Sequence, residues 1–146
     1  MKIYLDVCCS SRPFDDQSQD RIHLELEAIL AIMNKIESGQ WQLINSDIIV
    51  YEISKIPDFE KKNKVLCLIS KTDIHIILDD KCLYRAKEIE EYGIKTIDAI
   101  HLASAETAEA DIFLTTDDNL YKKLKTHSQK FNIKIDNRLS WIKEVI

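Results

Sequence analysis

The 146-residue sequence is poor in the residues that build several common functional sites. It contains only two glycines, so it has no glycine-rich loop for nucleotide phosphates, and neither a GxGxxG nor a Walker-type motif occurs. Its four cysteines show no CxxC spacing and no zinc-like pairing with histidines, which excludes a zinc ribbon or a dithiol redox motif. We therefore expect reduced thiols in a cytoplasmic protein.

Long apolar runs and an excess of positive charge are also missing. No apolar run approaches the roughly 20 residues that span a bilayer, and the opening KIYLD reaches an acid too early for a secretory segment. The net charge of −5 argues against general electrostatic attraction to nucleic acid. A local basic rim is nevertheless available, although solvated surface side chains are the simpler interpretation of its members: Arg12, Lys55, Lys61, Lys62, Lys122 and Lys123.

Short apolar runs alternate with segments whose apolar residues recur at helical spacing. We predict strands over residues 2–6, 41–44, 74–78, 112–115 and 133–135. We predict helices over residues 21–37, 47–56, 58–70, 80–92 and 96–108, and from residue 117. This alternation predicts an α/β fold, with a mostly parallel central sheet of about five strands and helices on both faces. The length and the lack of a linker predict one domain over residues 1–146.

Local signals mark several helix ends. Ser46, either Asp79 or Asp80, and Thr96 are expected as N-caps, and Gly39 as a C-cap. Alanines recur through residues 96–108, so that this helix can pack closely on the sheet. Near the end of the sequence, Trp141 and Ile142 are expected to dock the tail.

Acidic residues stand where the predicted strands and helices meet. Asp6 ends the first strand, Asp117 follows the strand 112–115, and Asp98 lies in the first turn of a helix. The carboxyl ends of neighbouring parallel strands lie at one edge of a sheet, where open α/β sheets carry their binding sites. Taken singly, each acid has a simpler explanation: a turn or capping role for Asp6 and Asp117, and a helix-dipole interaction of about 0.3–1 kcal/mol for Asp98.

Glu52 is more unusual, because its helical neighbours are isoleucines, and a carboxylate is seldom buried without a partner. The alternative is a surface ion pair with Lys55, worth about 0.3–0.5 kcal/mol. His101 lies one turn after Asp98, and packing or hydrogen bonding explains it better than metal ligation or base catalysis.

Convergence of these four acids would have a large electrostatic consequence. At a separation of about 6 Å and an effective dielectric of about 20, each ionised pair repels by roughly 3 kcal/mol. Six such pairs approach the whole stability of a domain, about 5–15 kcal/mol. The cluster must then take up protons, stay hydrated or bind divalent cations, and oxygen ligands favour Mg²⁺ or Mn²⁺ over zinc. Carboxylates that hold such ions suit phosphodiester hydrolysis.

The four acids stand in KIYLD (Asp6), YEISK (Glu52), TIDAIHLASA (Asp98) and FLTTDD (Asp117). In this order they resemble the PIN-domain family of metal-dependent ribonucleases, over essentially the whole chain, and TIDAIHLASA followed by FLTTDD is the strongest local similarity. Within the family the sequence looks closest to the small VapC-type toxins of bacterial toxin–antitoxin pairs. The resemblance implies a three-layer PIN-like fold, ligation of Mg²⁺ or Mn²⁺ by the four acids, cleavage of RNA, a homodimer, and inhibition by a small antitoxin protein.

The sequence departs from the family at two places. Cys8 stands where many relatives carry Asn, Ser or Thr, and it is a poor oxygen-ligand substitute. The last motif offers two acids, of which we assign Asp117 because it follows the threonines directly, with Asp118 as its rival. Arg12 is a candidate contact for a substrate phosphate, and a salt bridge to an acid of the same loop explains it equally well. The alternative function is a catalytically weak or inactive PIN-like interaction module.

Overall fold

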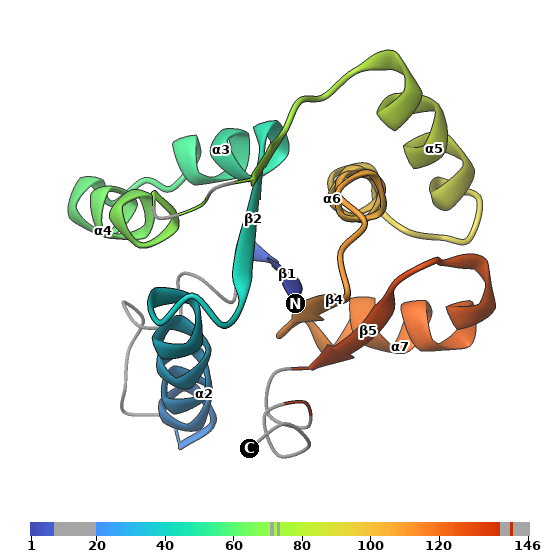
Figure 1. Cartoon of the computed structure of the whole chain (residues 1–146). Coiled ribbons are helices and arrows are strands. Elements are labelled where there is room, and N and C mark those ends of the chain that lie inside the picture. Colours follow the sequence, from blue (N-terminus) through green and yellow to red (C-terminus); the bar gives the residue numbers. More distant parts are fainter. Residues whose placement is uncertain (8–19, 71, 73, 138–140, 142–146) are drawn as a thin grey trace.

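Five strands and six α-helices follow one another in the part of the chain that the structure, a computed structural model, describes. The described residues are 1–7, 20–70, 72, 74–137 and 141. In chain order the elements are β1 (Lys2–Leu5), α2 (Asp20–Glu37), β2 (Gln42–Ser46), α3 (Asp47–Ser54), α4 (Phe59–Ile69), β3 (Ile74–Ile76), α5 (Asp80–Glu90), α6 (Thr96–Thr107), β4 (Ile112–Thr115), α7 (Asp118–Thr126), a 3₁₀ turn (Ser128–Lys130) and β5 (Lys134–Asn137) (Figure 1).

The strands form one sheet in the order β3-β2-β1-β4-β5, and each neighbouring pair is parallel. β1 lies at the centre, where Ile3 is in register with Leu43 of β2 and with Ile112 of β4. The predicted α/β fold with a sheet of about five strands is confirmed, and the described strands are all parallel. As a result, the carboxyl ends of β1, β2 and β4 share one edge.

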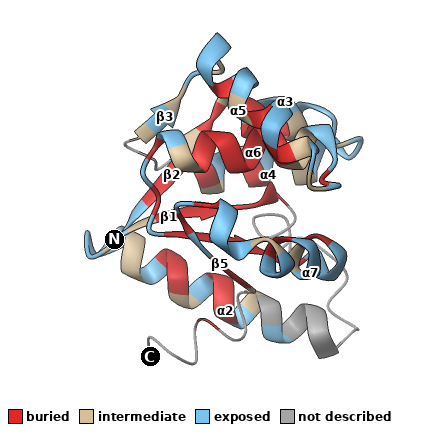
Figure 2. Ribbon diagram, turned by 90° about the vertical axis from the view of Figure 1, so that its right-hand side faces the viewer, coloured by how far each residue is buried: buried red, intermediate tan, exposed pale blue. Residues whose placement is uncertain are grey.

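Two hydrophobic clusters cover the two faces of the sheet. Figure 2 shows α2 on one face and α6 on the other, with α5 outside α6. Ile29 and Ile32 of α2 pack in the cluster that contains Leu5 of β1. The same cluster holds Trp141, whose ring centroid lies 5.0 Å from that of Trp41. The expected docking of Trp141 is confirmed, and Ile142 lies outside the described residues.

α6 is the most deeply placed helix of the described chain. All residues from Ala99 to Ala105 are buried, and they face both the sheet and α5. Small side chains make this close approach possible, because backbones can pack tightly where side-chain volume is low. The expected close packing of this helix is therefore confirmed.

Most of the expected helix ends are found, and one cap is wrong. Ser46 caps α3 by accepting from the backbone N–H of Ile49, and Asp79 rather than Asp80 caps α5. Thr96 does not cap α6: it is the first helical residue, and Lys95 occupies the N-cap without a side-chain hydrogen bond.

Strand limits differ from prediction because side chains compete for backbone groups. β3 ends at Ile76, since the N–H of Leu78 donates to the Asp47 carboxylate at 2.9 Å instead of continuing the sheet. Gly39 follows α2 with φ +80°, a conformation that glycine adopts without steric cost. None of the described helices is both long and apolar enough to cross a membrane.

Close packing of α6 gives a first prediction. Ala103, 1% exposed, leaves no room for a larger side chain, so Ala103→Leu should lower the free energy of unfolding by about 1–3 kcal/mol. Denaturant unfolding followed by circular dichroism measures this difference. Lys87→Leu on the exposed face of α5 is the matched control, with an expected change within about 0.5 kcal/mol. Equal stability of Ala103→Leu and the wild type would contradict tight packing of α6 on the sheet.

Candidate functional site

The four acids singled out in the sequence come from four different elements around one edge of the sheet. Asp6 directly follows β1, Glu52 lies in α3, Asp98 in the first turn of α6, and Asp117 is the N-cap of α7. The N–H of Asp6 donates to the carbonyl of Leu114 at 3.0 Å, which extends the β1–β4 pairing by one residue. Asp6 is therefore fixed at the end of β4.

One buried threonine connects two of the acids. The Oγ1 of Thr115 donates to Oδ2 of Asp6 at 2.9 Å and accepts from the N–H of Asp117 at 3.1 Å. Thr115 is fully buried, and Asp6 is only 7% exposed. The geometry of this edge thus depends on the last residue of β4.

Asp117 serves the fold and the site together. Its Oδ1 accepts from the N–H of Leu120 at 3.1 Å, as expected for an N-cap. Its side chain also lines a cavity that Asp98 lines from α6. Asp118, the first residue of α7, does not belong to the lining of this cavity. The arrangement favours Asp117 over Asp118 as the fourth member of the cluster.

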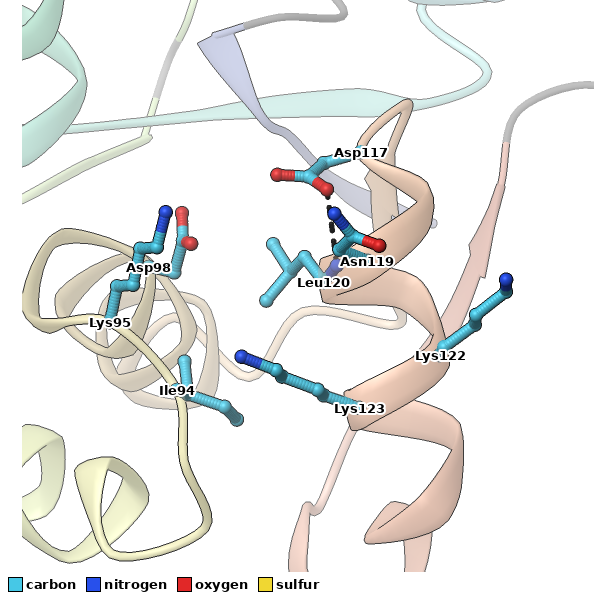
Figure 3. A pocket seen from close by; sticks show the side chains of 8 residues that line it. All are labelled: Ile94, Lys95, Asp98, Asp117, Asn119, Leu120, Lys122 and Lys123. Carbon is cyan, nitrogen blue, oxygen red and sulfur yellow. Dashed lines mark hydrogen bonds between the residues drawn. The ribbon is translucent and has the colours of Figure 1, made fainter.

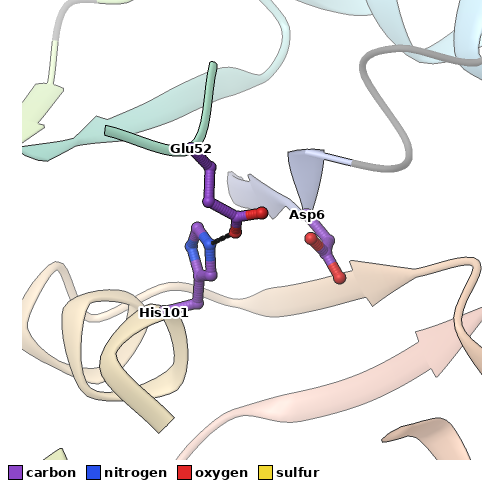
Figure 4. Close-up of side chains that lie close together, drawn as sticks. All are labelled: Asp6, Glu52 and His101. Atoms are coloured by element: carbon purple, nitrogen blue, oxygen red, sulfur yellow. Dashed lines mark hydrogen bonds and ion pairs between the residues drawn. The ribbon is translucent and has the colours of Figure 1, made fainter. Parts of the chain in front are cut away.

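Glu52 is held by a histidine rather than by a lysine. Nε2 of His101 hydrogen-bonds to Oε1 of Glu52, and Figure 4 shows the other carboxylate oxygen turned toward Asp6. Ligand atoms of Asp6, Glu52 and His101 all lie within 4.8 Å of one another. Lys55, the alternative partner, lies instead with Nζ 5.2 Å from the centroid of the Tyr51 ring.

Sequence reasoning assigns a packing or hydrogen-bonding role to His101 and misses its partners. His101 is fully buried, and its Nδ1 lies 2.6 Å from the hydroxyl of Tyr4. The same hydroxyl lies 2.8 Å from Oγ of Ser46. The only signal in the sequence is a tyrosine inside an otherwise apolar strand, because a buried hydroxyl needs a partner.

The pKa of the Asp98 carboxyl depends on the charges of the other acids. Burial, and then the charge of Asp6, raise this pKa to about 6. The charges of Asp117 and Glu52 also contribute to this increase, and His101 lowers the pKa. The charges of the other three acids therefore all act on Asp98.

The cavity beside this cluster has a volume of about 360 Å³ and a mixed lining of acids and lysines. Its lining residues are Ile94, Lys95, Asp98, Asp117, Asn119, Leu120, Lys122 and Lys123. Figure 3 shows Lys123 extending from α7 toward α6, and Lys95 lying alongside Asp98. Nζ of Lys123 also donates to the carbonyl of Gly93 at 3.0 Å. The sequence pointed to Lys122 and Lys123 for a basic rim but not to Lys95, and Arg12 lies outside the described residues.

The chemistry of the cluster matches that of a hard divalent cation. Four carboxylates offer oxygen ligands, which suit Mg²⁺ and Mn²⁺, and the pKa of Asp98 is raised first by burial and then by neighbouring negative charges that a cation would offset. His101 directs its Nε2 to Glu52. The oxygen atoms of the four acids could hold such an ion, and Asp6, Glu52 and His101 are the members whose ligand atoms lie within 4.8 Å of one another.

Comparison with known proteins supplies a family and a fold. The family model described as PIN domain matches residues 3–125. The chain is similar to the VapBC2 structure from Rickettsia felis bound to a DNA fragment from its promoter, with 19% identity, a TM-score of 0.56, and coverage of 94% of this chain and 98% of that chain. It is also similar to VapBC-1 from nontypeable Haemophilus influenzae, with 13% identity and the same TM-score and coverages. At these identities the likeness shows the fold. A search of curated proteins found no match.

The raised pKa of Asp98 gives a second prediction, about the dependence of stability on pH. This pKa is about 6 in the folded protein, against an ordinary value of 3.8, so the folded state holds the extra proton between these values. The free energy of unfolding should therefore fall as the pH rises from about 4 through 6, and Asp98→Asn should remove this loss. Without divalent cations at pH 7.5, we expect the variant to be more stable by about 1 kcal/mol after solvent screening, or roughly 3 °C in melting temperature.

Asp80→Asn is the matched control, because Asp80 is an exposed acid in the first turn of α5. Its loss of a favourable dipole interaction should leave stability unchanged or slightly lower. Melting curves between pH 4 and pH 8 compare the two variants with the wild type. A lower melting temperature for Asp98→Asn than for the wild type at pH 7.5 would contradict repulsion within the cluster.

Proposed function

The chain belongs to the PIN-domain family, and from this premise we propose that it is a Mg²⁺- or Mn²⁺-dependent endoribonuclease, the toxin of a toxin–antitoxin pair. The observation that carries the proposal is the convergence of Asp6, Glu52, Asp98 and Asp117, expressed in the pKa of Asp98. The structural bonds that three of these acids make do not require four carboxylates at one sheet edge, where their mutual repulsion opposes folding. Their oxygen atoms are suited to hold one or two divalent cations.

Three of the acids have distinct parts in the proposed reaction. Asp6, fixed by Thr115, and Asp117, fixed as a helix cap, hold their carboxylates in place before a cation arrives. Asp98 gives up the proton that its raised pKa retains near pH 6. A bound divalent cation supplies the positive charge that activates an attacking water and stabilises in-line displacement at phosphorus.

The lysines around the cavity support an anionic substrate. Lys95 and Lys123 line the same cavity as Asp98 and Asp117, so two lysines accompany the acids at the site despite the net charge of −5, while the amine of Lys122 points away from the cavity in Figure 3. Backbone phosphates of RNA are the groups that such lysines bind. The carboxylates repel the same phosphates, and RNA binding should therefore depend on both the lysines and the cation.

The proposed protein partners follow from the family and from the VapBC likeness. We include a small antitoxin and a second copy of the chain in the proposal. Large apolar side chains on the surface offer area for such contacts: Phe59 is 72% exposed, Tyr84 70% and Ile77 69%. A small gene beside this one, encoding a DNA-binding domain with a tail, would support the antitoxin, and light scattering would measure the oligomeric state.

Substitution of the acids tests the proposed chemistry. Asp98→Asn and Asp117→Asn should each lower Mn²⁺-dependent cleavage of RNA by at least about 100-fold, since both remove a carboxylate from the cluster. Asp118→Asn is the matched control and should keep most of the activity, because Asp118 does not line the cavity. Cleavage of a labelled RNA with and without EDTA measures the effect. Undiminished, metal-dependent cleavage by Asp98→Asn would overturn the assignment of the site.

Melting in the presence of Mn²⁺ separates this enzyme from an inactive interaction module. A site that binds the ion only in the folded protein gains stability, by about 2.7 kcal/mol at a concentration of 100 times the dissociation constant. The wild type should show this gain, and Asp98→Asn should lose most of it. No change of the wild-type melting temperature would favour the interaction module.

The lysine rim yields a separate prediction about RNA affinity. In an Asp98→Asn background, in which cleavage should be at least about 100-fold slower, Lys95→Ala with Lys123→Ala should weaken RNA binding several-fold. The slope of log affinity against log salt should become shallower by about 0.7 for each phosphate that the protein no longer neutralises. Fluorescence anisotropy across salt concentrations measures both the affinity and the slope. Lys87→Ala on α5 is the matched control, and equal salt slopes for the rim variant and this control would exclude the lysines from binding.

A further inference from the structure

A chain of buried hydrogen bonds begins and ends in the same helix. Ser46, the N-cap of α3, accepts from the N–H of Ile49, and its Oγ lies 2.8 Å from the Tyr4 hydroxyl. The Tyr4 hydroxyl lies 2.6 Å from Nδ1 of His101, whose Nε2 hydrogen-bonds to Glu52, further along α3. Ser46, Tyr4 and His101 are all fully buried. Three elements, α3, β1 and α6, are thereby joined by four polar side chains.

The direction of the protons follows from the acceptor at the end. An ionised carboxylate only accepts, so the proton between His101 and Glu52 belongs to Nε2. The arrangement that satisfies every partner then has Nδ1 accepting a hydrogen bond from the Tyr4 hydroxyl. The Tyr4 oxygen is left to accept from the hydroxyl of Ser46. Every donor in the chain therefore points toward Glu52, an arrangement in which each bond polarises the next.

The surroundings of Tyr4 keep this arrangement fixed. Its ring stacks on Phe113, with centroids 5.4 Å apart and an interplanar angle of 16°, and it meets the His101 ring edge-on at 5.7 Å. The Tyr4 side chain is fully buried, and its hydroxyl has both His101 and Ser46 within hydrogen-bond distance. The imidazole is thus held from one side by a rigid donor.

We propose that Ser46, Tyr4 and His101 form a positioning relay that fixes one oxygen of Glu52 and presents the other to Asp6 for cation binding. His101 acts through Glu52 and is a positioning residue, not a ligand. The proposed relay rests on the proposed function, because it positions one of the same four acids. It adds to the site three residues that do not themselves contact the substrate or the cation. Groups that orient a metal ligand typically change metal affinity or activity by about 10–100-fold when they are removed.

The position of the proton on the His101 ring tests the relay, first in the metal-free protein and then with Mg²⁺ added. ¹⁵N NMR of the protein at pH 7.5, free of divalent cations, should show a proton on Nε2 of His101 and none on Nδ1. Addition of saturating Mg²⁺ should leave the Nε2 proton in place. A proton on Nδ1 would overturn the relay, and loss of the Nε2 proton with Mg²⁺ would make His101 a ligand and overturn it equally.

The affinity for Mn²⁺, measured from the rise in melting temperature, tests whether the relay supports cation binding. Tyr4→Phe removes one hydroxyl and keeps the ring stacking, and it should weaken Mn²⁺ binding about tenfold. Tyr92→Phe makes the same chemical change at a half-buried tyrosine against the same hydrophobic cluster and should leave the affinity unchanged. His101→Gln, whose amide nitrogen reaches the Nε2 position, should bind Mn²⁺ more tightly than His101→Leu.

The outcomes separate this inference from the proposed function. A wild-type protein that binds Mn²⁺ without cleaving RNA would contradict the nuclease and leave the affinity test of the relay intact. A wild type that does not bind Mn²⁺ would contradict the role of the relay in cation binding. Equal Mn²⁺ affinity of Tyr4→Phe and the wild type would also overturn the relay, whatever the cleavage activity.

Discussion

Repulsion among four carboxylates at one edge of a parallel sheet is the constraint on which the rest of this structure depends. The effect is visible at Asp98, whose pKa rises to about 6 through burial and through the charges of its neighbours. Such a cluster persists only because other parts of the chain hold it together. The hydrophobic clusters on both faces of the sheet supply that stability, and the order β2-β1-β4 brings the strand ends to one place.

Three of the acids are each held by a hydrogen bond that also serves the fold. Thr115 donates to Asp6, Asp117 caps α7, and His101 bonds to Glu52. The carboxylate of Asp98 accepts no hydrogen bond from the residues that the structure describes. Its place at the start of α6 still gives it the favourable end of a helix dipole, about 0.3–1 kcal/mol. Burial and the negative charges of its neighbours both raise the pKa of this carboxyl.

The sequence was sufficient to predict the alternation of strands and helices, because apolar periodicity determines which faces are buried. It also identified Glu52, since a carboxylate among isoleucines requires an explanation. It did not reveal that His101, 49 residues away, supplies that explanation. Periodicity places a residue on a face but does not pair it with a residue of another helix. Strand ends were predicted less well, because a single bond from the N–H of Leu78 to Asp47 ends β3 early.

Lysines beside the cavity resolve an apparent conflict between the net charge of −5 and the proposed RNA substrate. Charges more than about 8 Å apart are largely screened at physiological salt, so the protein's overall charge has little influence on a phosphate at the cavity. Lys123 projects from α7 toward α6, and Lys95 lies alongside Asp98 at the same cavity. A phosphate there meets lysines and acids together. In the proposed function a divalent cation turns the acids from a barrier into part of the binding site, and it relieves the repulsion that raises the pKa of Asp98. By linkage, the same ion stabilises the fold, and substrate binding and folding are then controlled by one cluster of charges.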